Sequence, residues 1–187
     1  MAIKTFTAGS VLTASDTNTY LANSGLVYVT QVTVGSGVTT VNITSCFNST
    51  YDNYLISWAN ITATANSTVL QGKLLVGTTP NASNWTANTF FLASGGAGGF
   101  NNVAGTNQAL TEVGSCDATY KLAGFFNLQS PNLATASYIQ WSHMDNAYWR
   151  YNAAILRNST QYDGIQILAG AGTLTGGVIT VYGYRKA

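Results

Sequence analysis

The residues able to carry acid–base or nucleophilic chemistry are few in this chain and lie far apart. The only histidine is His143 and the only glutamate is Glu112, and no Gly-x-Ser-x-Gly elbow occurs. An acyl-transfer site needs a nucleophile with a base in reach, and a glycosidase needs two carboxylates across a cleft. We therefore expect His143 to be a structural residue at the end of a strand, and the sequence predicts no catalytic residues and no enzyme activity.

The aspartates do not form a metal-binding pattern. Asp52 and Asp145 are each followed by Asn and Asp163 is followed by Gly, which are pairs typical of turns. No Asp-x-Asp-x-Asp loop is present for calcium. The glycine-rich run at 94–99 lacks the Lys-Ser/Thr that follows a phosphate-binding loop. The sequence predicts neither a metal nor a cofactor.

The two cysteines, Cys46 and Cys116, have no second Cys or His at zinc-ligand spacing. We interpret them as small buried thiols and expect both to be reduced. A disulfide between them stays open as the alternative, because sequence alone does not give the distance between their Cα atoms.

Charged residues make up only 7% of the 187 residues, with a net charge of +1, while hydrophobic residues reach 46% and aromatic residues 12%. Typical soluble domains carry about 25% charged residues. The seven Lys and Arg form no basic tract, so we expect no nucleic-acid partner. No run of 18 apolar residues occurs, so we expect no membrane insertion.

Three long stretches, 17–51, 74–111 and 164–184, contain no Asp, Glu, Lys or Arg. Strands with exposed edges usually protect themselves from aggregation with charges or proline. A single copy of so neutral a chain has little protection of that kind. We therefore expect an oligomer of identical subunits, and we predict a homotrimer.

From residue 26 onward the chain alternates apolar and polar residues between turns rich in Gly, Asn and Ser, and no helical period extends beyond two turns. The expected strands are 26–34, 38–44, 53–62, 68–77, 120–128, 134–143, 148–156, 165–167 and 178–184. The first two look like a hairpin about the Gly-Ser-Gly turn at 35–37, and 78–117 looks like a long irregular loop. This pattern predicts an all-β fold, an antiparallel β-sandwich of the jelly-roll type, over residues 26–187.

Residues 1–25 carry too few large apolar side chains to form a core of their own. A short helical turn is expected in 13–23, with Ser15 or Asp16 as its N-cap. We interpret 1–25 as an N-terminal docking arm. Its candidate anchors are large apolar residues: Leu12, Tyr20 and Leu21.

An aromatic cluster flanks the turn at 144–147. Its members are Trp141, Tyr148, Trp149 and Tyr151. Exposed aromatic rings beside Asn and Asp side chains are typical of glycan-binding platforms, whereas packed aromatics dominate cores. Because alternation sends Trp149 and Tyr151 to one face and Tyr148 to the other, one face must be core. Core or subunit packing and a glycan platform both remain open.

Three segments carry a resemblance to a known class of proteins. Residues 6–18 follow the pattern aromatic-x-x-Gly-x-x-Leu-Thr-Ala-x-Asp-x-Asn, and 47–56 contain Phe-x-x-x-Tyr-Asp-Asn-Tyr before an expected strand. The closing strand lies in 172–185. In this order they resemble segments of fibre and virion structural proteins of tailed bacteriophages, especially cyanophages, while the middle of the chain, about 65–165, carries no such resemblance.

The resemblance implies a non-enzymatic β-sandwich, often trimeric, that is displayed on the virion. Its partners would be copies of itself and other virion proteins of the capsid or tail. It leaves open a tail fibre, a head fibre or a capsid decoration protein. The alternative function is a lectin-like adhesion module that binds host surface glycans, which would need the cluster around Trp149 to face solvent.

Overall fold

The computed structural model describes residues 7–16, 25–66, 68–81, 85–93, 95–96, 98–104, 110–119, 121–144 and 148–186. Within these ranges the chain forms two antiparallel β-sheets and one short helix, α1 (Ala14–Asp16). The sheets pack face to face, so the predicted all-β antiparallel sandwich is confirmed.

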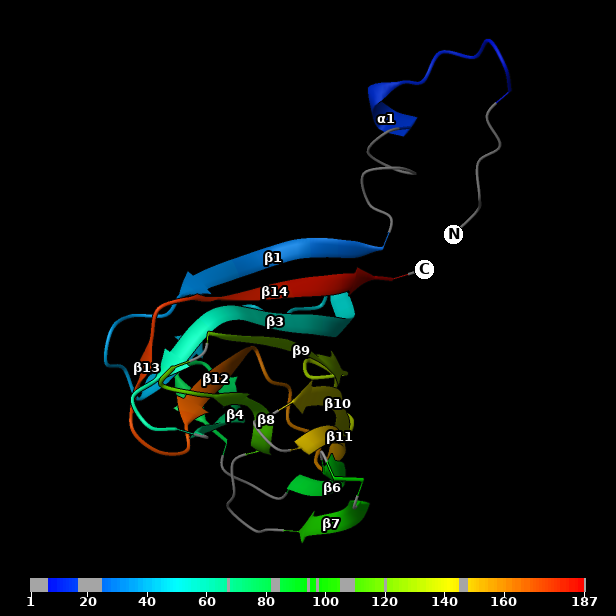
Figure 1. The fold of residues 1–187 in the computed structure, drawn as a ribbon. Helices are drawn as coiled ribbons and strands as arrows, with labels where there is room; N and C mark the ends of the chain where they lie inside the picture. The colour runs from blue at the N-terminus through cyan, green and yellow to red at the C-terminus, as the bar shows by residue number, and fades with distance from the viewer. Residues whose placement is uncertain are drawn as a thin grey trace.

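The larger sheet has nine strands in the order β1-β14-β3-β9-β10-β11-β6-β7, with β13 pairing to β3 outside that path. Its strands are β1 (Leu26–Thr33), β14 (Val178–Arg185), β3 (Tyr51–Ala63), β9 (Leu122–Gln129), β10 (Ser137–Met144), β11 (Tyr148–Leu156), β6 (Trp85–Ala93), β7 (Gly98–Ala104) and β13 (Leu174–Thr175). Figure 1 shows this sheet running from β1 at the top of the view to β7 at the bottom.

The smaller sheet has five strands in the order β2-β12-β4-β5, with β8 also pairing to β4. Its strands are β2 (Thr40–Ile43), β12 (Gly164–Ala169), β4 (Thr68–Val76), β5 (Thr79–Pro80) and β8 (Leu110–Cys116). This sheet covers one side of the larger sheet, and the buried side chains between the two form a single hydrophobic core.

Two expectations about strand pairing were wrong. The expected hairpin is not formed, because β1 pairs with β14 in the larger sheet while β2 pairs with β12 in the smaller one. The segment at 35–37 therefore crosses between the sheets. The expected loop at 78–117 contains four strands, β5, β6, β7 and β8. The Gly and Asn content of this segment disfavours strands. It forms strands because β6 pairs with the distant β11 and β8 pairs with the distant β4.

Trp58 on β3 joins the two sheets at the centre of the core. It is 5% exposed, and its indole ring lies against Gly114 on β8 of the smaller sheet and Gly124 on β9 of the larger. A Cβ atom at Gly114 would stand 2.4 Å from the ring, and one at Gly124 would stand 2.3 Å from it. Both glycines are therefore required by the space that the indole occupies.

The Phe-x-x-x-Tyr-Asp-Asn-Tyr segment packs its own aromatic side chains together at the start of β3. Tyr54 is fully buried, its ring lies 4.7 Å from that of Phe47, and its hydroxyl accepts from the Asn48 N–H at 2.8 Å. The same hydroxyl donates to the Asn48 carbonyl at 3.0 Å. Burial raises the pKa of Tyr54 to about 12. This tyrosine thus fixes the loop that leads into β3.

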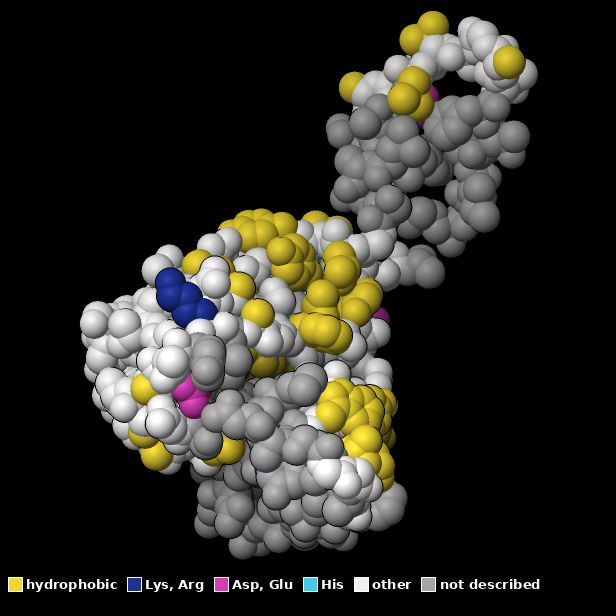
Figure 2. All heavy atoms as spheres, in the orientation of Figure 1, with side chains coloured by type: hydrophobic (Ala, Val, Ile, Leu, Met, Phe, Trp, Pro, Cys, Tyr) yellow, Lys and Arg dark blue, Asp and Glu magenta, His cyan; other side chains and the backbone are white. Residues whose placement is uncertain are grey.

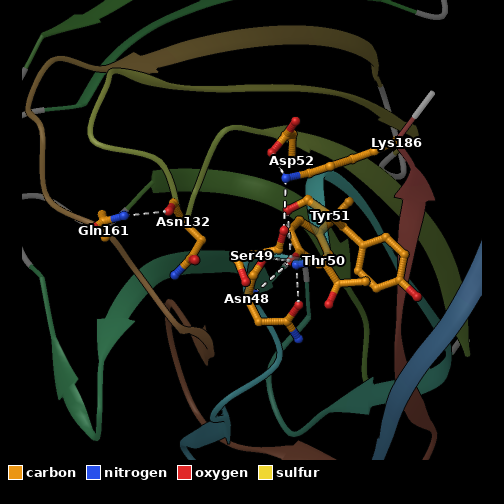
Figure 3. A network of polar contacts seen from close by, with 9 residues as sticks. Asn48, Ser49, Thr50, Tyr51, Asp52, Asn132, Gln161 and Lys186 are labelled. Atoms are coloured by element: carbon orange, nitrogen blue, oxygen red, sulfur yellow. Dashed lines mark hydrogen bonds and ion pairs between the residues drawn. The ribbon is translucent and has the colours of Figure 1, made fainter.

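The loop held by Tyr54 is also tied to the C-terminal strand (Figure 3). Lys186 Nζ lies 2.7 Å from Asp52 Oδ1 and donates to the Ser49 carbonyl at 2.8 Å. The Thr50 N–H donates to Asn48 Oδ1 at 2.9 Å. Because Asp52 and Lys186 are well exposed, the ion pair adds little free energy and mainly orients the chain end.

Cys46 is a free thiol, 1% exposed, whose Sγ donates to the Ile43 carbonyl at 3.4 Å. Burial raises its pKa to about 12. The expectation of a small buried thiol is confirmed for Cys46, whereas the side chain of Cys116 lies outside what the structure describes.

The Trp58 contact predicts a stability effect at Gly124. In Gly124→Ala the new methyl group overlaps the indole, so the free energy of unfolding should fall by about 1–3 kcal/mol. Urea unfolding followed by tryptophan fluorescence measures it. Gly95→Ala is the matched control, because nothing lies within 4 Å of a Cβ there. Equal stabilities for the two variants would contradict the packing described.

The buried hydroxyl of Tyr54 predicts an alkaline loss of stability. Its pKa is near 10 in the unfolded chain and about 12 in the folded one, so the protonated form favours folding. The free energy of unfolding should therefore decline as pH rises from about 10 towards 12. Tyr54→Phe should lower it by about 1–3 kcal/mol at pH 8 and remove this part of the decline. An unchanged alkaline slope in Tyr54→Phe would contradict the assignment.

Candidate functional site

The outward side of the larger sheet carries most of the exposed large apolar side chains. Eleven such side chains occur in the described part of the chain, and eight lie on this side. They are Leu26, Tyr28, Leu92, Phe125, Tyr138, Trp149, Tyr151 and Tyr184. We call this surface the aromatic face. Figure 2 shows two groups of hydrophobic side chains on the visible flank, one in the region of β1, β14 and β3 and one in the region of β10 and β11.

Strand alternation and register create the aromatic face. In β3 the burial pattern alternates between buried and partly exposed positions, which separates core from surface. The registers then line up outward side chains in rows across neighbouring strands. One row is Phe125, Ser142, Tyr151 and Phe90. The next row is Tyr28, Tyr182, Leu55, Asn127 and Gln140.

Ring contacts hold several of these side chains in place. The rings of Trp149 and Tyr151 are stacked, with centroids 6.5 Å apart and planes at 28°. Phe90 meets Trp149 edge-on at 6.4 Å, and Tyr28 meets Tyr182 edge-on at 6.3 Å. Trp149 and Tyr151 are nevertheless 41% and 47% exposed. Both side chains are therefore partly accessible to another molecule.

A shallow hollow of about 270 Å³ lies on the aromatic face, where β14, β3, β9 and β10 adjoin. Its lining consists of four residues with side-chain amides, one tyrosine and one leucine: Asn53, Asn127, Gln129, Gln140, Tyr184 and Leu128. The Tyr184 hydroxyl donates to Asn127 Oδ1 at 2.7 Å. We call this group the amide hollow. Amides both donate and accept hydrogen bonds without carrying a charge.

None of the outward-facing side chains in the rows given above is charged. A charged group appears at the margin of the face, where Arg157 Nη1 donates to Thr86 Oγ1 at 3.2 Å. The Lys186–Asp52 pair lies near the ends of β14 and β3. The two central rows are therefore neutral and offer stacking, apolar contact and neutral hydrogen bonds, while the charged groups named here lie at the margin.

The glycan platform, one of the two alternatives that the sequence left open for the aromatic cluster, is brought together only in part. Trp149 and Tyr151 lie side by side on one face, as strand alternation predicted, and the structure shows that this face is exposed. The prediction was wrong for Trp141, which is 3% exposed and belongs to the core, because it points to the inner side of β10. The side chain of Tyr148 lies outside what the structure describes.

Sequence reasoning did not single out Tyr28, Phe125 or Tyr138, nor the amide hollow. Alternation within 134–143 could have predicted that Tyr138 faces outward, because it is next to the buried Ile139 and therefore lies on the opposite face of the strand. No local pattern contains the cross-strand register that brings these residues together, because β3, β9 and β14 are distant in sequence.

The described part of the arm stands apart from the sandwich (Figure 1). The helical turn is confirmed at Ala14–Asp16, but its N-cap is Thr13 rather than Ser15 or Asp16. Thr13 Oγ1 accepts from the Asp16 N–H at 3.1 Å, and Asp16 Oδ2 accepts from the Thr13 hydroxyl at 2.8 Å. Asp16 Oδ2 also accepts from the Thr13 N–H at 3.2 Å, which completes a capping box with Asp in place of Glu.

The predicted anchors of the arm are only partly described. Leu12 is 49% exposed and its neighbour Val11 is 85% exposed. Tyr20 and Leu21 lie outside the described residues. The arm therefore presents at least two apolar side chains that its own capped turn does not cover.

Two of the aspartates, Asp117 and Asp163, hold loops, whereas Asp145 and the side chain of Glu112 lie outside what the structure describes. Asp163 accepts from the Gly77 N–H at 2.9 Å, and Asp117 accepts from the Thr119 N–H at 2.7 Å. His143 is 9% exposed near the end of β10. In the part of the chain that the structure covers, no three His, Cys, Asp or Glu side chains gather where they could hold a metal ion.

No family model, curated protein or solved structure matches the chain. None of the helices in the described ranges has the length and apolar character needed to cross a membrane.

Proposed function

We propose that the chain is a non-enzymatic structural protein of a bacteriophage virion. It is displayed on the particle as a tail fibre, a head fibre or a capsid decoration protein, and it docks through its N-terminal arm, residues 1–25. Its partners are other virion proteins and copies of itself, with a homotrimer as the state that the resemblance implies. The three motif segments at 6–18, 47–56 and 172–185 support this assignment.

The observation that carries the proposal is that the arm has an ordered turn and exposes apolar side chains beside it. Residues 7–16 hold their own turn through the Thr13–Asp16 hydrogen bonds while Val11 and Leu12 remain exposed. A turn that is ordered by its own contacts and exposes apolar side chains loses less entropy when it docks. The sandwich has its own core, so attachment and folding can be separate tasks of one chain.

Burying Leu12 and a second large side chain would contribute on the order of 3–5 kcal/mol before ordering costs. In an oligomer the arms attach together, so a modest affinity of each arm becomes a stable attachment through avidity. The neutral composition, with 7% charged residues and a net charge of +1, fits a surface that is partly covered in an assembly.

The proposal predicts that deleting residues 1–25 leaves the sandwich folded but prevents its attachment. The measurement is add-back of purified chain to particles assembled without it, with bound copies quantified after sedimentation. Leu12→Ala in the full chain should weaken attachment about tenfold or more. Val76→Ala is the matched control, because Val76 is exposed to the same degree on the smaller sheet. Full occupancy by the truncated chain would contradict attachment through the arm.

A lectin-like adhesion module is the second candidate, and the exposed stack of Trp149 on Tyr151 favours it. Aromatic faces beside side-chain amides match the apolar and hydroxyl surfaces of neutral sugars. A glycan array distinguishes this candidate. Specific binding by the full chain that Trp149→Ala abolishes and Val76→Ala retains would establish adhesion, and a blank array would remove this candidate.

A further inference from the structure

We propose that the aromatic face is the surface through which copies of this chain pack against one another. The inference deepens the proposed function, because it names the surface by which the displayed sandwiches associate. The size, composition and neutrality of the aromatic face support the inference, and it can be tested on the purified chain without virus particles.

The size of the face is the first argument. In sheet order, the strands β1, β14, β3, β9, β10, β11 and β6 lie side by side and span roughly 30 Å across the sheet at the usual spacing between strands. Along the strands, three to four rows of outward side chains span roughly 20 Å. The flat projection is therefore on the order of 600 Å², and side-chain relief brings the accessible area near the about 800 Å² that each partner gives to a standard interface. A small glycan covers only part of such a surface, whereas neighbouring copies of the chain in an oligomer can cover all of it.

The composition of the face is the second argument. Soluble monomers rarely expose apolar patches of more than a few hundred Å². Here the exposed aromatic side chains are 37–59% accessible and belong to five different strands of one sheet. Tyr, Trp and Phe are enriched and charged residues depleted in the centres of protein interfaces.

The neutrality of the face identifies the occupant. A partner that carried charges would bury them against a surface without opposite charges, which is unfavourable. A second copy presents the same uncharged surface and meets no such penalty. The amide hollow adds complementarity, because Asn127 and Gln140 each offer donors and acceptors that the same groups of a copy can satisfy. The charged Arg157 lies at the margin, where interfaces are polar.

Light scattering of the full chain between about 1 and 100 μM tests the inference. We expect a mass of more than one chain, with dissociation on dilution. Gln140→Lys places one charge in the amide hollow at an exposed position, so it should leave folding intact and raise the dissociation midpoint at least tenfold. Thr79→Lys, an exposed position on β5, is the matched control and should associate like the unmodified chain.

Phe125→Thr combined with Tyr151→Thr is the second variant, with circular dichroism as the check on folding. It should also weaken association at least tenfold, because it removes apolar area while retaining residues suited to strands. A single-chain mass throughout, or unchanged association in both face variants, would overturn the inference. So would a glycan that binds a single-chain species through Trp149.

The outcomes also separate this inference from the proposed function. A chain that associates through the aromatic face but never joins particles would defeat the virion assignment alone. A chain of single mass that decorates particles through its arm would defeat the self-association alone.

Discussion

The two-residue alternation of strands, combined with the unequal size of the two sheets, governs the structure. A nine-stranded sheet has two faces, and the five-stranded sheet covers only one of them. The covered face holds Tyr54, Trp58 and Phe126 in a close-packed core, and the opposite parity of the same strands must face outward. On this chain the outward residues are aromatic rings and amides rather than charges, so folding itself produces a large neutral surface.

The arm and the sandwich obey different constraints. In the arm the capping box joins Thr13 and Asp16, which are three residues apart, so these hydrogen bonds are local and involve no core residue. In the sandwich almost every element depends on distant partners, as with β14, which lies between β1 and β3. In the function proposed above, the locally ordered arm would hold a partner and the sandwich would present its surface.

Sequence predicted the existence of most strands, because alternation is a local signal, and the segments expected at 120–128, 134–143 and 148–156 pair consecutively as β9, β10 and β11. It did not predict which strands pair when they are far apart in the sequence. The expectations of a hairpin about 35–37 and of a loop at 78–117 were therefore wrong. The same limit applied to the site. Trp149 and Tyr151 were found from local alternation, whereas Trp141 was assigned to a platform although it is buried, and Phe125 was missed because only sheet register brings it near them.

The central claim is that the aromatic face is open in one chain and covered when copies meet. Hydroxyl-radical footprinting of the full chain at increasing concentration tests it directly, residue by residue, with mass spectrometry as the readout. The account predicts that oxidation of Tyr28, Phe125 and Trp149 falls together as concentration rises, while oxidation of the exposed Val76 on the smaller sheet stays constant. Oxidation of the face that is independent of concentration, or protection centred on Val76, would contradict it.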